Sequence, residues 1–237
     1  MTTAAGGTEL KRWAELRLAR RGTTNAAEQA WWSWLQVPPE LGVRLRSAPM
    51  VLTPSDIEAL GGQIPQDLSE AEHVVVAELR SGERGELVGL EGAAWGPAEG
   101  LGDFVPLIAT DDLRWRREAI GYGLCGPIRR FPAIVLVESF ADLTLAEASV
   151  QAEPSVHVIC PHPGASATCW SQLLSKTANA ALMAVGRSDG KGPLEPVLRA
   201  MTMIGRAVRI FPYEALGATG AYAPAIRGLV EFVRSEG

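Results

Sequence analysis

The chain has 237 residues, which is enough for one large domain or two small ones. Hydrophobic residues make up 47% of it and charged residues 21%, both near the averages for folded globular proteins, which excludes a disordered or fibrous chain. The net charge of −5 argues against a protein that coats nucleic acid non-specifically, because such binding depends on many contacts from Lys and Arg to phosphates. Any contact with nucleic acid must therefore be local.

The sequence lacks the features of membrane, secreted and disulfide-rich proteins. The sequence has no apolar run of roughly 20 residues, so no membrane span is expected. The N-terminus lacks the apolar segment of a secretory signal, and we expect a cytoplasmic protein. The three cysteines, Cys125, Cys160 and Cys169, form no C-x-x-C pair, so neither a disulfide framework nor a cysteine zinc site is expected.

The first part of the chain predicts helices. Residues 9–35 are rich in Ala, Leu, Glu, Arg and Trp, with apolar residues near helical spacing, which predicts one or two helices. Trp31, Trp32 and Trp34 resemble a platform for a ligand, but buried aromatic anchors of a helix are the commoner use of such residues. We therefore assign them to the core.

A β-rich region follows. Residues 73–77 and 86–90 are apolar and flank the glycine-containing stretch 81–85, which predicts a β-hairpin. Residues 94–102 are rich in glycine and are expected to break regular structure.

After Pro132 the pattern alternates regularly between short apolar runs and helical periodicity. This alternation is typical of a parallel sheet with crossover helices, whose strands are buried on both faces. The predicted strands are residues 133–137, 156–160, 180–185 and 207–211, and the predicted helices are residues 140–151, 166–176, 194–206 and 224–234.

A glutamate ends the first of these strands. Functional groups of open α/β sheets lie at the carboxyl ends of the strands, where loops and helix N-termini converge. Glu138 directly follows a strand of apolar residues, and its burial is costly unless a metal, a cation or hydrogen-bond donors meet it. The alternative is that Glu138 caps the following helix.

A second carboxylate follows the third strand. Asp189 lies in a loop with Gly186, Gly190 and Gly192, which let the backbone approach a phosphate or a metal ligand closely. An ordinary Asp-Gly turn is the alternative. If the two strands are neighbours, Glu138 and Asp189 can share one Mg²⁺ through their oxygens.

These stretches resemble the motifs of the Toprim domain of DNA primases and topoisomerases. The resemblance lies in residues 134–142 (IVLVESFAD), in a loop that ends in Pro163-Gly164, and in residues 184–192 (AVGRSDGKG). In that family a glutamate ends the first strand, with an Asp a few residues later, and a D-x-D pair ends the third. Residues 123–128 (GLCGPI) are similar to the segment that precedes Toprim in primases of phages, plasmids and mobile elements.

The resemblance implies an architecture and a site. It implies an α/β protein whose C-terminal Toprim-like domain, residues 131–237, has a parallel sheet with crossover helices, preceded by a smaller α+β primase-like N-terminal subdomain, residues 1–130. It implies that Glu138 and Asp189 are catalytic and hold Mg²⁺ or Mn²⁺. Four residues would support that site, namely Asp142, Gly186, Gly190 and Gly192.

Two positions depart from the family pattern. Ser139 stands where the family usually has Gly, and Arg187 stands where the first Asp of D-x-D is expected. A guanidinium cannot ligate a metal, but it can pair with Glu138 or with a phosphate. We expect Arg187, if it lies within about 4 Å of Glu138, to compete with the metal for that carboxylate.

Basic residues are candidates for nucleic-acid or phosphate binding. Arginine and lysine side chains can bind a template strand through its phosphates. The alternative is a solvated face that pairs with Asp111, Asp112 and Glu118. Besides Arg187, the candidates are Arg114, Arg116, Arg117, Arg129, Arg130 and Lys191.

Three functions are consistent with these observations. The first is a primase-type nucleotidyltransferase that makes RNA primers in DNA replication with Mg²⁺, with single-stranded DNA and nucleotides as ligands and a replicative helicase as a possible partner. The second is a catalytically degenerate Toprim protein, a nucleic-acid- or nucleotide-binding accessory of a mobile element, which Arg187 favours. The third is an unrelated α/β domain that acts on a small phosphorylated substrate, with residues 186–192 as an anion loop, and has no need of the upstream arginines.

Overall fold

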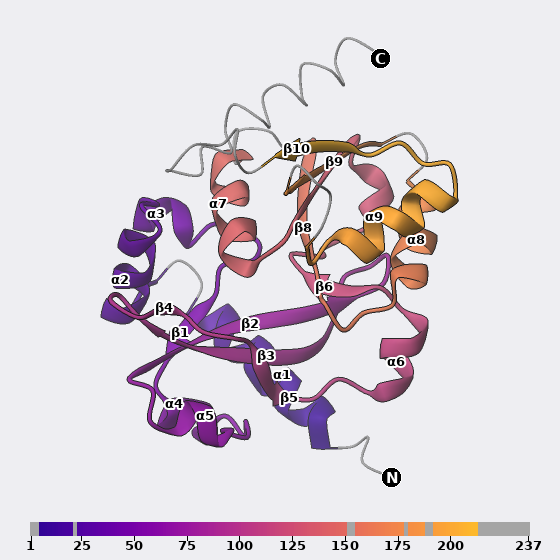
Figure 1. Cartoon of the computed structure of the whole chain (residues 1–237). Coiled ribbons are helices and arrows are strands. Elements are labelled where there is room, and N and C mark those ends of the chain that lie inside the picture. Colours follow the sequence, from indigo (N-terminus) through magenta and orange to yellow (C-terminus); the bar gives the residue numbers. More distant parts are fainter. Residues whose placement is uncertain (1–4, 21–22, 151–154, 178–179, 188–191, 213–237) are drawn as a thin grey trace. The chain divides into compact units, whose positions relative to one another are not determined.

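The computed structural model describes residues 5–20, 23–150, 155–177, 180–187 and 192–212 (Figure 1). The chain forms two compact units. The first comprises Met1–Leu79 and Leu87–Asp111, and the second comprises Arg80–Glu86 and Asp112–Gly237. The predicted division into an α+β primase-like subdomain, residues 1–130, and a Toprim-like domain, residues 131–237, stays a prediction. No helix among the described residues has the length and apolar character to cross a membrane.

The first unit begins with the predicted helices. α1 and α2 cover the stretch 9–35 in which we expected one or two helices. Asn25 and Glu28 form a reciprocal capping box that fixes the start of α2, and Thr53 and Asp56 do the same for α4. The helices are α1 (Ala5–Ala19), α2 (Ala26–Trp34), α3 (Pro39–Gly42), α4 (Pro54–Ala59) and α5 (Gln66–Ser69).

The predicted hairpin is confirmed. β2 (His73–Ser81) and β3 (Glu86–Gly96) are neighbours, joined by a turn in which Gly82 and Gly85 have positive φ values of 64° and 65°. A side chain at Gly85 would also collide with the backbone of Cys125. β1 (Met50–Leu52) pairs antiparallel with β2, and β5 (Val105–Ile108) pairs antiparallel with β3.

The glycine-rich stretch 94–102 corrects one expectation. It was expected to break regular structure, but β3 runs to Gly96 and β4 (Gly100–Leu101) pairs back on it in antiparallel fashion. Gly100, at φ 81°, lets the chain reverse tightly enough for Trp95 to pair with Leu101. Glycine here makes a second hairpin turn rather than an irregular segment.

Two of the three tryptophans of α2 belong to the core, as predicted. Trp31 and Trp32 are buried, with 0% and 1% of their surface exposed, whereas Trp34 is 36% exposed, so its assignment to the core is wrong. Trp31 packs edge-on against Trp95, with ring centroids 5.6 Å apart. This geometry is typical of aromatic core packing and leaves no open platform at Trp31.

The second unit has the predicted alternation. β7 (Ala133–Val137), α7 (Phe140–Val150), β8 (Val156–Pro161), α8 (Ala167–Ser175), β9 (Ala181–Gly186), α9 (Glu195–Met203) and β10 (Arg209–Pro212) follow the predicted ranges to within a few residues. The predicted helix 224–234 lies outside the described residues. The unit also contains α6 (Asp112–Arg117), β6 (Ile120–Tyr122) and the short helix η1 (Ile128–Arg130).

The four strands β10, β9, β7 and β8 form a parallel sheet in that order, and β6 pairs antiparallel with β8. Every residue of β7 is buried, because α7 covers one face of the sheet and α8 and α9 lie together on the other (Figure 1). Alternate residues of the strands, such as Ile134 and Leu136, join Trp170 and Met201 in one core cluster. The sheet thus places the ends of β7 and β9 side by side.

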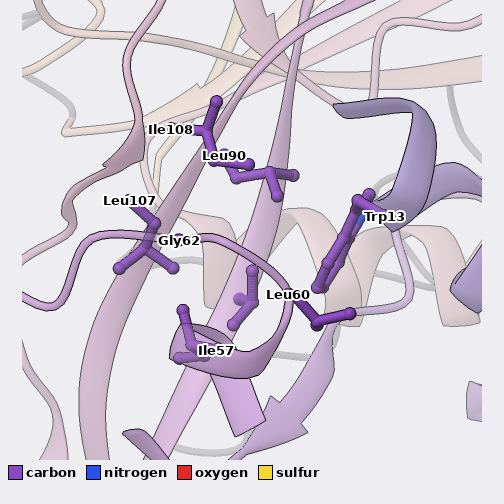
Figure 2. A pocket seen from close by; sticks show the side chains of 8 residues that line it. Trp13, Ile57, Leu60, Gly62, Leu90, Leu107 and Ile108 are labelled. Atoms are coloured by element: carbon purple, nitrogen blue, oxygen red, sulfur yellow. The ribbon is translucent and has the colours of Figure 1, made fainter. Parts of the chain in front are cut away.

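A small apolar cavity lies in the core of the first unit. Its volume is about 10 Å³, and Figure 2 shows that apolar side chains, among them Trp13, Leu60 and Leu107, face one another around it. An apolar void of this size stays dry and is too small for a ligand. Trp13 closes it from α1, and its Nε1 donates a hydrogen bond of 3.0 Å to Glu78, which Arg17 also pairs at 2.8 Å.

Replacing Trp13 with Ala should lower the free energy of unfolding by about 3–5 kcal/mol, because it enlarges this void and leaves the buried Glu78 without one of its donors. Chemical denaturation monitored by circular dichroism measures the change. Leu18→Ala is the matched control, since Leu18 lies on the same helix and is 69% exposed, and it should cost no more than about 0.5 kcal/mol. Equal effects of the two variants would show that α1 does not anchor the core.

Candidate functional site

Glu138 lies at the carboxyl edge of the parallel sheet, directly after β7. Val137 pairs with Val185 in the register of β7 and β9, so Glu138 comes next to Gly186. The ends of β7 and β9 are thus neighbours, as the shared site requires. The side chain of Glu138 is half-buried and faces the segment that follows β9.

Two glycines leave room for the Glu138 carboxylate. A Cβ atom at Gly186 would lie 2.7 Å from Glu138 Oε1, and one at Gly192 would lie 2.8 Å from the same oxygen. Gly192 also has a φ of 131°, which residues with a side chain rarely adopt. Gly186 and Gly192 flank the predicted anion loop, so both ends of that loop contact Glu138. A side chain at either glycine would thus displace the carboxylate, while their role as supporting residues of a metal site stays a prediction.

The helix after Glu138 is capped by other residues. Ser139 Oγ accepts a hydrogen bond of 3.1 Å from the backbone N–H of Asp142 and donates one of 2.6 Å to the Asp142 carboxylate. Ser139, rather than Glu138, therefore performs the capping role that we considered for the glutamate. Asp142 thus helps to fix the start of α7.

Cys160 is a buried thiol near the acidic residues of this edge. The thiol is buried on β8, and burial raises its pKa above the usual value; the nearby carboxylates of Asp142 and Glu138 raise it further. The thiol therefore lies within electrostatic range of both carboxylates at this edge of the sheet. The sequence did not indicate that Cys160 lies near these carboxylates.

An aromatic row lies along the same edge. The rings of Trp115 and His162 have centroids 4.7 Å apart, Tyr122 lies 5.9 Å from His162, and Phe140 lies 5.4 Å from Tyr122. His162 Nδ1 accepts a hydrogen bond of 2.9 Å from the N–H of Gly164, which holds the ring in place. Sequence reasoning gave His162 no role, although its position directly after a strand of the sheet was a usable signal.

The candidate arginines do not form one group. Arg114, on α6, pairs with Glu86 at 3.2 Å and with Glu118 at 3.7 Å, as the alternative of a solvated ion-paired face predicted. Arg116 and Arg117 are exposed on the same helix, whose Trp115 contacts His162 near the carboxyl edge. Through Trp115, α6 therefore contacts the segment that follows β8.

Arg129 and Arg130 lie elsewhere. They precede β7, at the amino edge of the sheet, whereas Glu138 follows β7 at the carboxyl edge. Six residue steps at roughly 3.3 Å each separate Pro132 from Glu138, a distance of about 20 Å. Arg129 and Arg130 therefore do not lie beside Glu138, and binding of a template by the arginines stays a prediction.

The remaining predicted site residues are only partly described. Arg187 is exposed and directly follows β9, while Asp189, Gly190 and Lys191 lie outside the described residues. The distance between Glu138 and Asp189 thus stays a prediction. Within the described part of the chain, no three His, Cys, Asp or Glu side chains form a group that could hold a metal ion.

Comparison with known proteins identifies a fold rather than a family. No family model and no curated protein matches the sequence. The chain is similar to a solved structure described as the DnaG catalytic core, with a TM-score of 0.59 and 15% sequence identity over 98% of this chain and 79% of that chain. At this identity the likeness concerns the fold. The chain therefore has a mixed α/β fold like that of the DnaG catalytic core.

The raised pKa of Cys160 predicts a pH-dependent stability difference. Above pH 9.0, the ordinary pKa of the thiol, the unfolded chain loses the thiol proton while the folded chain keeps it, so rising pH favours unfolding. The free energy of unfolding of the wild type minus that of Cys160→Ala should be constant below pH 8 and fall by about 1.4 kcal/mol per pH unit above pH 9. Urea denaturation across this range measures it. Parallel curves for the two proteins would contradict the burial of a neutral thiol.

Proposed function

We propose that this chain is a primase-type nucleotidyltransferase of DNA replication that uses Mg²⁺ or Mn²⁺ at the carboxyl edge of its parallel sheet. The observation that carries the proposal is the position of the Glu138 carboxylate against Gly186 and Gly192. The likeness of nearly the whole chain to the DnaG catalytic core supports it. The sequence resemblance to Toprim motifs indicates the same glutamate.

The chemistry of Glu138 fits a hard divalent cation. Mg²⁺ binds oxygen ligands and often uses only one or two carboxylates together with substrate phosphates. Glu138 would provide one of these carboxylates. Asp189, which lies three positions from Gly186 and three from Gly192 in the sequence, would provide the second. The bound ion would stabilise the charge that develops on the transferred phosphoryl group.

The other residues of this edge have roles in binding and orientation. The Ser139 cap keeps the chain after Glu138 in a fixed conformation. Arg187 and Lys191 would contact phosphates of the incoming nucleotide, and Arg116 and Arg117 would contact the template strand. Trp115 and His162, both half-buried, offer an aromatic surface on which a base can stack. Single-stranded DNA and nucleotides are thus the proposed ligands, and a replicative helicase is a proposed partner.

Primer synthesis on a single-stranded DNA template tests the proposal. With Mg²⁺ or Mn²⁺ and ribonucleotides, the wild type should make primers, and Glu138→Gln should reduce the rate at least about 100-fold, because the amide removes the charge that holds the metal. Glu195→Gln is the matched control, since Glu195 is a surface acid paired with Arg199, and it should leave the rate unchanged. Primer synthesis by Glu138→Gln at the wild-type rate would exclude this glutamate from catalysis.

Arg187 favours a second function. It places a fixed positive charge directly after β9, at a position where the Toprim resemblance expects a carboxylate. The second candidate is therefore a catalytically degenerate accessory protein of a mobile element that binds nucleic acid or nucleotide. In this case single-stranded DNA binding, measured by fluorescence anisotropy, should weaken in Arg116→Ala/Arg117→Ala while no primers form.

Arg187→Asp separates the two candidates. It replaces a repelling charge with an oxygen ligand, so calorimetry should show tighter Mg²⁺ binding than in the wild type. Tighter metal binding with no primer synthesis by either form supports the accessory function. Robust synthesis by the wild type, with no gain of metal affinity in Arg187→Asp, would contradict the accessory function and support the enzyme.

A further inference from the structure

A cationic cleft opens at the amino edge of the second unit's sheet. Its volume is about 420 Å³, and its lining includes Arg129, Arg130, Phe131, Lys176 and Ala180. Arg129 and Arg130 come from η1, before β7, and Ala180 precedes β9, so the cleft lies where these two strands begin. The carboxylate site at Glu138 lies at the other end of the same strands. The cleft is therefore a separate site.

The charge of the cleft is positive although the whole chain is acidic. Neither Arg129 nor Arg130 forms a salt bridge with a residue that the structure describes. Lys176 pairs with Glu83 at 2.7 Å between Nζ and Oε1. The hydrogen bond from Lys176 lowers the pKa of Glu83, and the charges of Lys176, Arg129 and Arg84 lower it further. One carboxylate thus lies among several cations, which leaves an excess of positive charge for an anionic ligand.

The frame of the cleft is held by hydrogen bonds. Arg206 Nη2 donates to the carbonyl oxygens of Thr177 and Ala180, each at 2.5 Å. Ala181 N–H donates to the carbonyl oxygen of Pro132 at 2.8 Å, which joins the start of β9 to the residue before β7. Arg206 therefore fixes the backbone of the cleft, while Arg129 and Arg130 are exposed and available to a ligand.

One wall of the cleft is apolar. The ring of Phe131 stacks on that of the buried His157, with centroids 4.4 Å apart and planes 11° from parallel. This contact holds the ring of Phe131 in one orientation. A ligand that fits the cleft should therefore combine an anionic part with an apolar part.

We propose that this cleft binds a nucleotide, a nucleoside di- or triphosphate, through its phosphates and without a metal ion. Arginine and lysine recognise phosphate oxygens directly, and the base would lie against the wall at Phe131. The volume agrees with the range of about 300–1,000 Å³ that is typical of small-ligand pockets. This site is independent of the proposed function. Its binding groups are cationic side chains at the amino edge of the sheet, whereas the proposed function depends on carboxylates at the carboxyl edge.

Calorimetry with the full chain in EDTA tests the proposal. ATP should bind the wild type, and Arg129→Ala/Arg130→Ala should weaken its binding by at least about tenfold. Glu83→Gln should tighten it several-fold, because Lys176 is then released to the phosphates. Glu138→Gln should have no effect, since no metal takes part. Failure of primer synthesis would therefore leave this result intact.

The controls separate a nucleotide site from general attraction of anions. Lys11→Ala/Arg12→Ala removes the same charge from exposed positions of α1 and should leave ATP binding unchanged. Adenosine should not bind, and tripolyphosphate should bind more weakly than ATP. The proposal is overturned by ATP affinity that is equal in the wild type and Arg129→Ala/Arg130→Ala. Tripolyphosphate that binds as tightly as ATP would also overturn it. The same holds if a short oligothymidylate without terminal phosphates binds through these arginines and ATP does not.

Discussion

The parallel pairing of β7 with β9 is the constraint on which the candidate site depends. The register that opposes Val137 to Val185 brings Glu138 beside Gly186, and any side chain at Gly186 or Gly192 would collide with the carboxylate. Because both strands are buried between α7 on one face and α8 and α9 on the other, the register cannot slip without repacking buried side chains against both layers of helices. Packing of the sheet thus determines where the glutamate points, and the glycines determine that it has room.

The alternation of short apolar runs with helical periodicity was enough to predict β7, β8, β9 and β10 and the helices between them, since strands buried on both faces have an unambiguous apolar pattern. The same reasoning located Glu138 at a strand end. It missed the Ser139 cap, although Ser-x-x-Asp before an apolar run is a signature of a helix N-terminus. It also misjudged residues 94–102, because glycine permits a tight hairpin turn as readily as it breaks a strand. The separation of Arg129 and Arg130 from Glu138 follows from the direction of β7, and the predicted strand 133–137 already implied it, because the arginines precede this strand and the glutamate follows it.

The two ends of the parallel strands differ in chemistry. The carboxyl edge carries Glu138, Asp142 and a buried thiol whose pKa these acids help to raise, and it suits a cation that in turn binds phosphates. The amino edge carries Arg129, Arg130 and Lys176, and it suits phosphates directly. The fold that contains both edges is similar to that of the DnaG catalytic core. What each edge binds is determined by its own residues.

Binding of Mn²⁺ tests the central claim most directly, because it needs neither a template nor turnover. Electron paramagnetic resonance of free Mn²⁺, titrated with the wild type and with Glu138→Gln, measures the affinity of the carboxyl edge alone. The account predicts that the wild type binds Mn²⁺ and that Glu138→Gln binds it at least about tenfold more weakly, since the substitution removes a charged oxygen ligand while keeping the shape of the side chain. Equal Mn²⁺ affinity in the two proteins would contradict the claim that Glu138, against Gly186 and Gly192, is a metal ligand.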